Sequence, residues 1–175
     1  MSRKVVNELF QWLVALVLAA AIVIPIRVYV LQPYRVYMTS MVPTLEPGDI
    51  VIGLKSTIVG NGIERGDIVI VGGAFSNGEL YVKRVIGLPG ETISINDGEV
   101  YINGQELEEP WLPSDEGFNS SGELSEVKLG ENQYFVLGDN RFASRDSRSF
   151  GPVTKQDIKA KVVLRIFPLD KIRSF

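Results

Sequence analysis

The chain of 175 residues contains no histidine and no cysteine. These two absences exclude a Ser-His-Asp triad, a cysteine nucleophile and a His/Cys zinc site from the chemistry of any hydrolase built from it. Without cysteine there is no disulfide framework either, and the redox compartment stays undecided. Hydroxyl, carboxylate, amine and guanidinium groups remain, so we expect neither a metal nor a cofactor.

The chain also has fewer basic than acidic residues. Lys and Arg total 18 against 21 Asp and Glu, which gives a formal net charge of −3. Proteins that bind nucleic acid usually present an excess of cationic surface. We therefore expect no nucleic-acid partner.

One long segment has no charged residue at all. It covers residues 9–26, and apolar residues resume after Arg27 as far as Leu31. About 20 helical residues at a rise of ~1.5 Å cover a hydrocarbon core of roughly 30 Å. A cleavable signal peptide is the competing interpretation, but its apolar region is shorter, and here Ala19-Ala20-Ala21 lies in the middle of the run. The pattern predicts a permanent anchor over residues 9–31 after a short tail, residues 1–8.

Basic residues flank this anchor almost equally, with Arg3 and Lys4 before it and Arg27 and Arg35 after it. Positive charge next to a span favours the cytoplasmic side. The short basic N-terminus favours a cytoplasmic tail by a narrow margin. We expect a single-pass protein of the cell membrane whose remaining residues, 32–175, lie outside the cytoplasm.

Beyond the anchor, short β-branched runs alternate with Gly, Pro, Asn and Asp, a pattern typical of strands and turns. An Asn-Asp-Gly turn at residues 96–98 predicts a hairpin between residues 92–95 and 99–102. A polar segment, 113–125, predicts a flexible loop, and residues 154–158 predict a helical turn. We therefore expect an all-β catalytic domain of coiled antiparallel sheets over 32–175, with a hairpin and loop subregion at 96–130, preceded by one transmembrane α-helix. Further strands are expected at residues 49–54, 67–71, 80–86, 133–137 and 161–167.

Two residues suggest chemistry that needs no histidine. A serine hydroxyl such as that of Ser40 becomes a good nucleophile only when a base removes its proton. Lysine has an ordinary pKa near 10.4, but burial disfavours its charged form and can lower that pKa by up to about 3–5 units. Alternation along the expected strand sends Lys83 to one face and Arg84 to the other. The competing interpretation is a pair of solvated charges on an edge strand.

Four short motifs in one order add a family resemblance. They are SMVPTL at residues 40–45, RGDIV at 65–69, KRVIGLPG at 83–90, and GDNR at 138–141 followed by Ser144 and the DSR of residues 146–148. Together with the anchor, this set resembles type I signal peptidase, the membrane-bound Ser/Lys endopeptidase that cleaves N-terminal signal peptides from exported preproteins. The resemblance covers most of the chain and implies the same function.

The resemblance also implies roles for individual residues. Ser40 would be the nucleophile, Lys83 the general base, and Ser144 the residue whose hydroxyl orients that lysine. Preprotein cleavage sites carry small residues, which suit shallow apolar pockets beside a strand. Five residues would line these pockets: Val36, Met41, Leu45, Tyr81 and Val82. Five charged residues would form a structural ion-pair network: Arg84, Asp139, Arg141, Asp146 and Arg148. The implied partners are preprotein signal peptides and the lipid bilayer.

Two positions depart from the family pattern. Some members carry a hydroxyl residue two positions before the nucleophile, where it helps to hold the oxyanion, and this chain has Met38. The backbone N–H of Ser40 remains as a donor, and Thr39 is a candidate for the second. Phe142 and Ala143 replace residues that are more often polar.

Two other hypotheses share parts of this pattern. A self-cleaving Ser/Lys repressor-like protein has the same fold, but it needs a DNA-binding domain in place of an anchor. A catalytically silent, membrane-anchored β module that binds a partner has no reason to retain Ser40, Lys83 and Ser144 together. The sequence does not indicate an oligomeric state.

Overall fold

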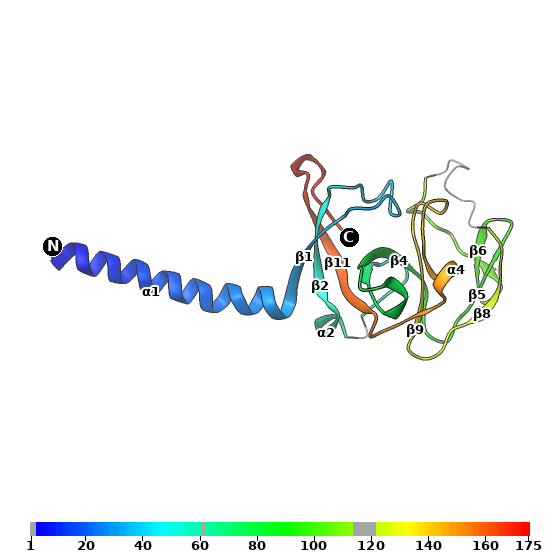
Figure 1. Cartoon of the computed structure of the whole chain (residues 1–175), viewed down its shortest axis with the longest axis horizontal. Coiled ribbons are helices and arrows are strands. Elements are labelled where there is room, and N and C mark those ends of the chain that lie inside the picture. Colours follow the sequence, from blue (N-terminus) through cyan, green and yellow to red (C-terminus); the bar gives the residue numbers. More distant parts are fainter. Residues whose placement is uncertain (1–2, 61, 114–121) are drawn as a thin grey trace.

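The structure of the chain is a computed structural model that describes residues 3–60, 62–113 and 122–175. A long helix, α1 (Arg3–Pro25), projects from a β domain (Figure 1). It continues into a short π-helix, η1 (Ile26–Val30), and the first strand, β1 (Leu31–Arg35), follows at once. Helical structure therefore begins within the predicted tail and ends one residue before the predicted boundary of the anchor.

Within this helical segment, Phe10–Val30 is long and apolar enough to cross a bilayer, and the side chains of its apolar window are not buried against the rest of the protein. A helix that is apolar on every face is stable only where all of its side chains are shielded from water, in a protein core or in a bilayer. The length, composition and exposure of α1 thus agree with a membrane anchor.

The strands form two sheets, and every strand pair is antiparallel. The larger sheet has the order β1-β2-β11-β3-β4-β9-β10, with β12 paired to β11. Register shifts in β11 where it pairs with β2 and with β3 mark β-bulges, which bend a strand and increase its twist. The sheet therefore coils. Its strands after β1 are β2 (Ile50–Lys55), β3 (Ile68–Val71), β4 (Tyr81–Gly87), β9 (Gln133–Leu137), β10 (Val153–Thr154), β11 (Ile158–Phe167) and β12 (Arg173–Ser174).

The smaller sheet has the order β7-β6-β5-β8 and lies beside β9 and α4 (Figure 1). Its strands are β5 (Thr92–Asn96), β6 (Glu99–Ile102), β7 (Gln105–Glu106) and β8 (Leu124–Lys128). The predicted hairpin is confirmed, because β5 pairs with β6 and the two residues at the tip, Asp97 and Gly98, have φ of 51° and 87°. Positive φ at both positions is what a tight hairpin turn requires.

Three buried apolar clusters hold the domain together. One is formed by side chains of the loop after β1 (residues 36–49) and of β2, β3 and β11. A second lies between β3, β4, β9 and β10, and the third joins β4 and β9 to the smaller sheet. The short helices cover the margins: α2 (Ser56–Val59), η2 (Ala74–Ser76), α4 (Ser147–Phe150) and η3 (Leu169–Lys171).

The predicted fold class, an all-β domain of coiled antiparallel sheets behind one apolar helix, is confirmed. At residues 154–158, where the sequence predicts a helical turn, the chain makes a single turn between β10, which ends at Thr154, and β11, which begins at Ile158. Asp157 N–H donates to the Thr154 carbonyl and Ile158 N–H to the Lys155 carbonyl, so the turn is present but does not extend into a helix. The Asp157 carboxylate accepts hydrogen bonds from the N–H and hydroxyl of Thr154, which closes the turn tightly.

The loop predicted at residues 113–125 is too long, since Leu124 and Ser125 belong to β8. Most of the remainder of this predicted loop, residues 114–121, lies outside the described residues.

Candidate active site

The loop after β1 presents Ser40 above a buried apolar cluster. Its ends are tied together because Val36 donates a hydrogen bond to the Asp49 carbonyl and Gly48 donates one to the Val36 carbonyl. Inside the loop, the N–H of Leu45 donates to the carbonyl of Met41, and both side chains are fully buried. The position of Ser40 is therefore fixed by the buried apolar residues that follow it in the loop.

Lys83 lies in the middle of β4, opposite Val69 of β3, and its side chain is only 2% exposed. Its Nζ donates a hydrogen bond to Ser40 Oγ at 2.7 Å. Although 43 residues separate them in the sequence, the two groups lie within the hydrogen-bond reach that a nucleophile and its base need.

Burial lowers the pKa of Lys83 from 10.5 to about 8. The charges nearby act in both directions: the Asp146 carboxylate raises this pKa, the Arg148 guanidinium lowers it, and Asp139 raises it. Desolvation is the largest cause, because an ammonium group loses its hydration inside an apolar wall. A substantial fraction of Lys83 is therefore neutral at mildly alkaline pH and able to accept a proton.

The neighbouring Arg84 points to the other face of β4 and makes a bidentate pair with Asp139, at 2.8 and 2.6 Å. Asp146 likewise accepts two hydrogen bonds from the Arg148 guanidinium, both at 2.8 Å. Arg141 forms its ion pair with Glu109, a residue that the sequence reasoning did not include. The five predicted residues thus form separate pairs, and these pairs are joined through backbone carbonyls, such as that of Arg141, which accepts from Arg148.

The segment that follows β9 packs directly on Ser40. The backbone N–H of Asn140 donates to the Ser40 carbonyl at 3.0 Å. A Cβ at Gly138 would lie 2.5 Å from that same carbonyl oxygen and 2.3 Å from Ser144 Oγ, so only glycine fits. Gly138 and Asn140 both belong to the GDNR motif, but the motif alone did not indicate these contacts with Ser40.

The hydroxyl of Ser144 is buried, and within the described part of the chain it has no hydrogen-bond partner. Its predicted contact with Lys83 is therefore not formed in this arrangement. Buried hydroxyl groups are normally satisfied. This oxygen is available to a group that arrives at the site.

A tight groove of about 50 Å³ opens beside Ser40 and Lys83. Four of the five residues predicted to bind substrate line it, together with Arg35, Tyr37, Met38 and Leu80: Val36, Met41, Tyr81 and Val82. Leu45 is not among the residues that line the groove, and its side chain packs in the apolar cluster that Met41 and Val36 also join, so its role in substrate binding stays a prediction.

One edge of β4 is open next to this groove. β4 pairs with β3 from Tyr81 to Arg84, but it pairs with β9 only from Arg84 onward. Among the described residues, the backbone of Tyr81, Val82 and Lys83 thus has no strand on its β9 side. An unpaired strand edge can accept an extended peptide as an additional strand.

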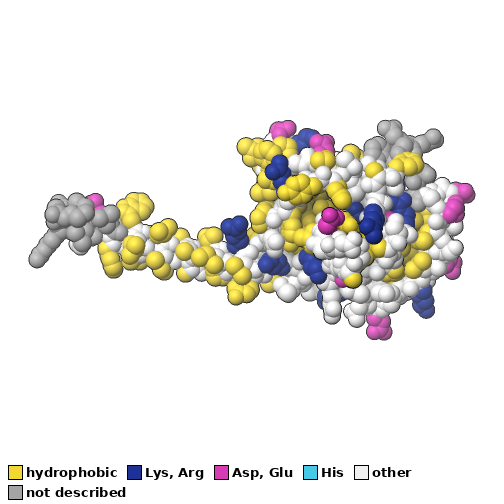
Figure 2. Space-filling view, in the orientation of Figure 1, with side chains coloured by type: hydrophobic (Ala, Val, Ile, Leu, Met, Phe, Trp, Pro, Cys, Tyr) yellow, Lys and Arg dark blue, Asp and Glu magenta, His cyan; other side chains and the backbone are white. Residues whose placement is uncertain are grey.

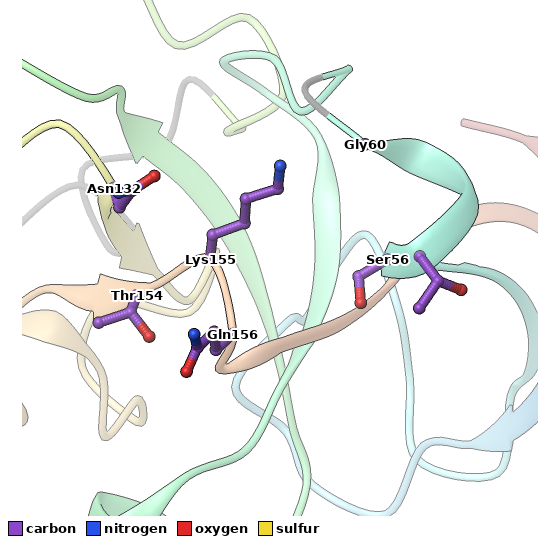
Figure 3. A pocket seen from close by; sticks show the side chains of 7 residues that line it. Ser56, Gly60, Asn132, Thr154, Lys155 and Gln156 are labelled. Carbon is purple, nitrogen blue, oxygen red and sulfur yellow. The ribbon is translucent and has the colours of Figure 1, made fainter.

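A second cavity, of about 570 Å³, lies between α2 and the turn from β10 to β11 (Figure 3). Its walls carry hydroxyl and amide groups and the amine of Lys155, from the residues Ser56, Thr57, Gly60, Asn132, Thr154, Lys155 and Gln156. No hydrogen bond between the described hydroxyls of this cavity and a lysine amine is seen, in contrast to Ser40. Within the described residues, no group of three or more Asp or Glu side chains is placed to hold a metal ion.

Comparisons with known proteins agree on one family. The sequence model of the family described as "Signal peptidase, peptidase S26" matches residues 9–167. The chain is 38% identical over 174 residues to Signal peptidase I of Bacillus licheniformis, covering 95% of this chain and 93% of the relative. It is 36% identical over 179 residues to Signal peptidase I T of Bacillus subtilis (strain 168), covering 98% and 92%.

A solved structure is also similar. The crystal structure of a signal peptidase I from Enterococcus faecalis V583 matches with a TM-score of 0.50 at 35% identity. The match covers 56% of this chain and 94% of that one.

Proposed function

The chain belongs to the signal peptidase family S26, and on that premise we propose that it is a serine-type endopeptidase that cleaves signal peptides from exported preproteins. Ser40 is the nucleophile and Lys83 the general base. The observation that carries this proposal is the 2.7 Å hydrogen bond from Lys83 Nζ to Ser40 Oγ, made by a lysine whose burial lowers its pKa to about 8. A catalytically silent β module is not favoured. The relatives are named as peptidases, and their similarity extends over almost the whole chain.

The reaction proceeds in two halves. Neutral Lys83 accepts the hydroxyl proton of Ser40 as Oγ bonds to the scissile carbonyl carbon, and the resulting ammonium gives that proton to the leaving nitrogen as the C–N bond breaks. The signal peptide then remains as an ester on Ser40. Lys83 next takes a proton from water as the water oxygen attacks the ester carbonyl, and it returns that proton to Ser40 Oγ as the signal peptide leaves with a free carboxyl group.

The negative oxygen of each tetrahedral intermediate needs hydrogen-bond donors. The backbone N–H of Ser40 donates to no acceptor within the described residues and is free for this role. Met38 is half exposed and ends in a thioether, so its side chain supplies no N–H or O–H donor. We assign the first donor to Ser40 N–H and retain the side chain of the preceding residue, Thr39, as the candidate for the second.

The small groove sets the substrate class. A tight groove of about 50 Å³ favours small substrate side chains. A substrate strand that pairs with the open edge of Tyr81–Lys83 places alternate side chains toward Val36, Met41 and Val82. This arrangement suits the small residues that precede a signal-peptide cleavage site.

We further propose that α1 anchors the protein in the cell membrane as a single span, with the N-terminus in the cytoplasm and the β domain outside it. Large apolar side chains are exposed beside the groove, among them Tyr37, Met38 and Leu80. Others, Leu169 and Ile172, project from the η3 turn. An ion pair between Lys171 and Glu46 connects this turn to the nucleophile loop, residues 36–49. These apolar side chains fit contact with the bilayer at the depth where signal peptides emerge.

The function is tested by incubating the purified full-length protein in detergent with a preprotein. We expect one cut after a small residue, with the mature N-terminus identified by sequencing and the released signal peptide by mass spectrometry. Cleavage at scattered sites, or none with any preprotein that has small residues before its processing site, contradicts the proposal.

The buried lysine predicts the pH dependence of cleavage. Protonated Lys83 cannot accept the Ser40 proton, and its pKa of about 8 places the loss of activity below that pH. We expect kcat/KM to fall about tenfold for each pH unit below roughly 7 and to level off above about 9. A profile measured with an uncharged peptide substrate checks this expectation, and a flat profile between about pH 5 and 9 is incompatible with it.

Ser144 is proposed to orient Lys83 once substrate is bound. The change Ser144→Ala is expected to lower kcat about tenfold with little effect on KM, and to move the kinetic pKa. Alanine has no hydroxyl that could contact the Lys83 amine in the substrate complex. Ser144→Thr, which retains the hydroxyl, is the control and should restore much of the rate. Unchanged kcat and unchanged pKa in Ser144→Ala would remove this role.

A further inference from the structure

The end of the anchor carries positive charge that no acidic side chain of the described structure neutralises. Arg27, in η1, is exposed and belongs to none of the ion pairs. Lys55, the last residue of β2, donates to the Val28 carbonyl at 2.6 Å and likewise has no acidic partner. Its ammonium group therefore lies against the last helical turn, at the carbonyl of the residue that follows Arg27.

The sequence around this junction is free of acidic residues. No Asp or Glu occurs in residues 9–45 or in residues 50–63. The two acids between these ranges are already paired, Glu46 with Lys171 and Asp49 with Arg165. The unneutralised charge is local, since the whole chain has a net charge of −3. Figure 2 shows dark blue side chains where the apolar helix meets the domain and no magenta side chain there on that face.

A groove of about 490 Å³ lies at the same point, between the end of the anchor and β1. Ile24 and Val28 form its apolar wall, and Arg27 and Gln32 supply its polar groups. The apolar span ends at Val30, so the polar groups lie at the level where hydrocarbon gives way to headgroups. One wall thus matches acyl chain and glycerol, and the other matches a phosphate.

We propose that this junction, made of Arg27, Lys55 and the groove between η1 and β1, binds the headgroup phosphate of an anionic phospholipid. The Arg27 guanidinium presents several donors in a planar fork that suits phosphate oxygens. Lys55 uses one of its three N–H donors on Val28 and retains two for the same phosphate. Because Lys55 belongs to β2 and Arg27 to the anchor, a bound lipid bridges the two and restrains the domain relative to the membrane.

The test uses the full-length protein purified in detergent and exposed to an equimolar mixture of phosphatidylglycerol and phosphatidylcholine of identical acyl chains. Native mass spectrometry then counts the lipids retained. We expect the wild type to retain phosphatidylglycerol in about tenfold excess, and the double variant Arg27→Gln/Lys55→Gln to retain the two lipids about equally. The control Lys128→Gln, at an exposed position of β8 in the smaller sheet, should retain the preference.

Equal retention of the two lipids by the wild type, or an unchanged preference in Arg27→Gln/Lys55→Gln, would overturn the site. Full competition by millimolar glycerol 1-phosphate would also overturn it as a lipid site, because the apolar wall would then contribute nothing. The inference depends on a membrane-spanning α1 and not on the Ser40–Lys83 chemistry. Preprotein cleavage in lipid-free detergent, where the double variant should match the wild type, separates a failure of this site from a failure of the proposed function.

Discussion

Replacing Ser40 by alanine or Lys83 by methionine is expected to reduce preprotein cleavage by at least about 10⁴-fold. The alanine variant has no side-chain oxygen to form the ester. The methionine variant lacks the amine that is hydrogen-bonded to Ser40 Oγ in the wild type, and so has no base at that oxygen. Because the two groups act as one unit, the double variant should be no worse than either single one. Single-turnover cleavage of a preprotein measures all three rates.

Lys83→Met is also expected to stabilise the protein, which separates a catalytic role from a structural one. A pKa lowered from 10.5 to about 8 corresponds to a cost of up to about 3 kcal/mol for the buried ammonium. Below pH 8 Lys83 is protonated in both the folded and the unfolded state, so folding bears the full free-energy cost of burying the ammonium group. Between about pH 8 and 10.5 the unfolded chain binds the proton and the folded one does not, so wild-type stability rises with pH.

Urea unfolding at several pH values therefore should show the advantage of Lys83→Met at pH 7 and its decline toward pH 10.5. Lys128→Met, at an exposed position of β8, is the control and should leave both cleavage and the pH dependence of stability unchanged. Substantial cleavage by Lys83→Met would refute the general-base assignment, and a variant less stable than the wild type at pH 7 would refute the desolvation argument.

Gly138→Ala is expected to lower kcat/KM by about 100-fold or more. The added methyl group would lie 2.3 Å from Ser144 Oγ, 2.5 Å from the Ser40 carbonyl and 2.6 Å from Ser144 Cβ. None of these atoms is the end of a flexible chain, so the backbone around the nucleophile has to shift. Shifts of about 1 Å at a catalytic group cost roughly two orders of magnitude in rate. Overpacking a filled site also costs about 1–3 kcal/mol of stability.

Gly130→Ala is the matched control for this glycine. Its added methyl group would meet only the flexible end of Gln133, at 3.2 Å, so activity and stability should stay near wild type. Kinetics and urea unfolding of both variants provide the comparison. Wild-type activity in Gly138→Ala would mean that the contact between residues 138–144 and the nucleophile loop is not needed for cleavage.

Several features of this protein followed from short stretches of its sequence. The length of the apolar run indicated one span, and α1 with η1 occupies nearly the predicted residues. The Asp97-Gly98 pair predicted the hairpin, because the required positive φ is a property of those residues. Other strands were missed for equally local reasons. β1 contains Pro33 and continues the apolar run of the anchor, and β8 is polar and mostly exposed.

The candidate site depended far more on contacts between distant segments. Motif order pointed to Ser40 and Lys83, but their 2.7 Å approach and the pKa of about 8 exist only because β4 and the nucleophile loop bury the amine together. The same packing sent Leu45 into the core, brought Asn140 to the Ser40 carbonyl and paired Arg141 with Glu109. Hydropathy and turn chemistry are properties of adjacent residues and can be read along a chain. Desolvation, close approach and the choice of ion-pair partner are set by whatever the fold places alongside, and no neighbouring residue encodes them.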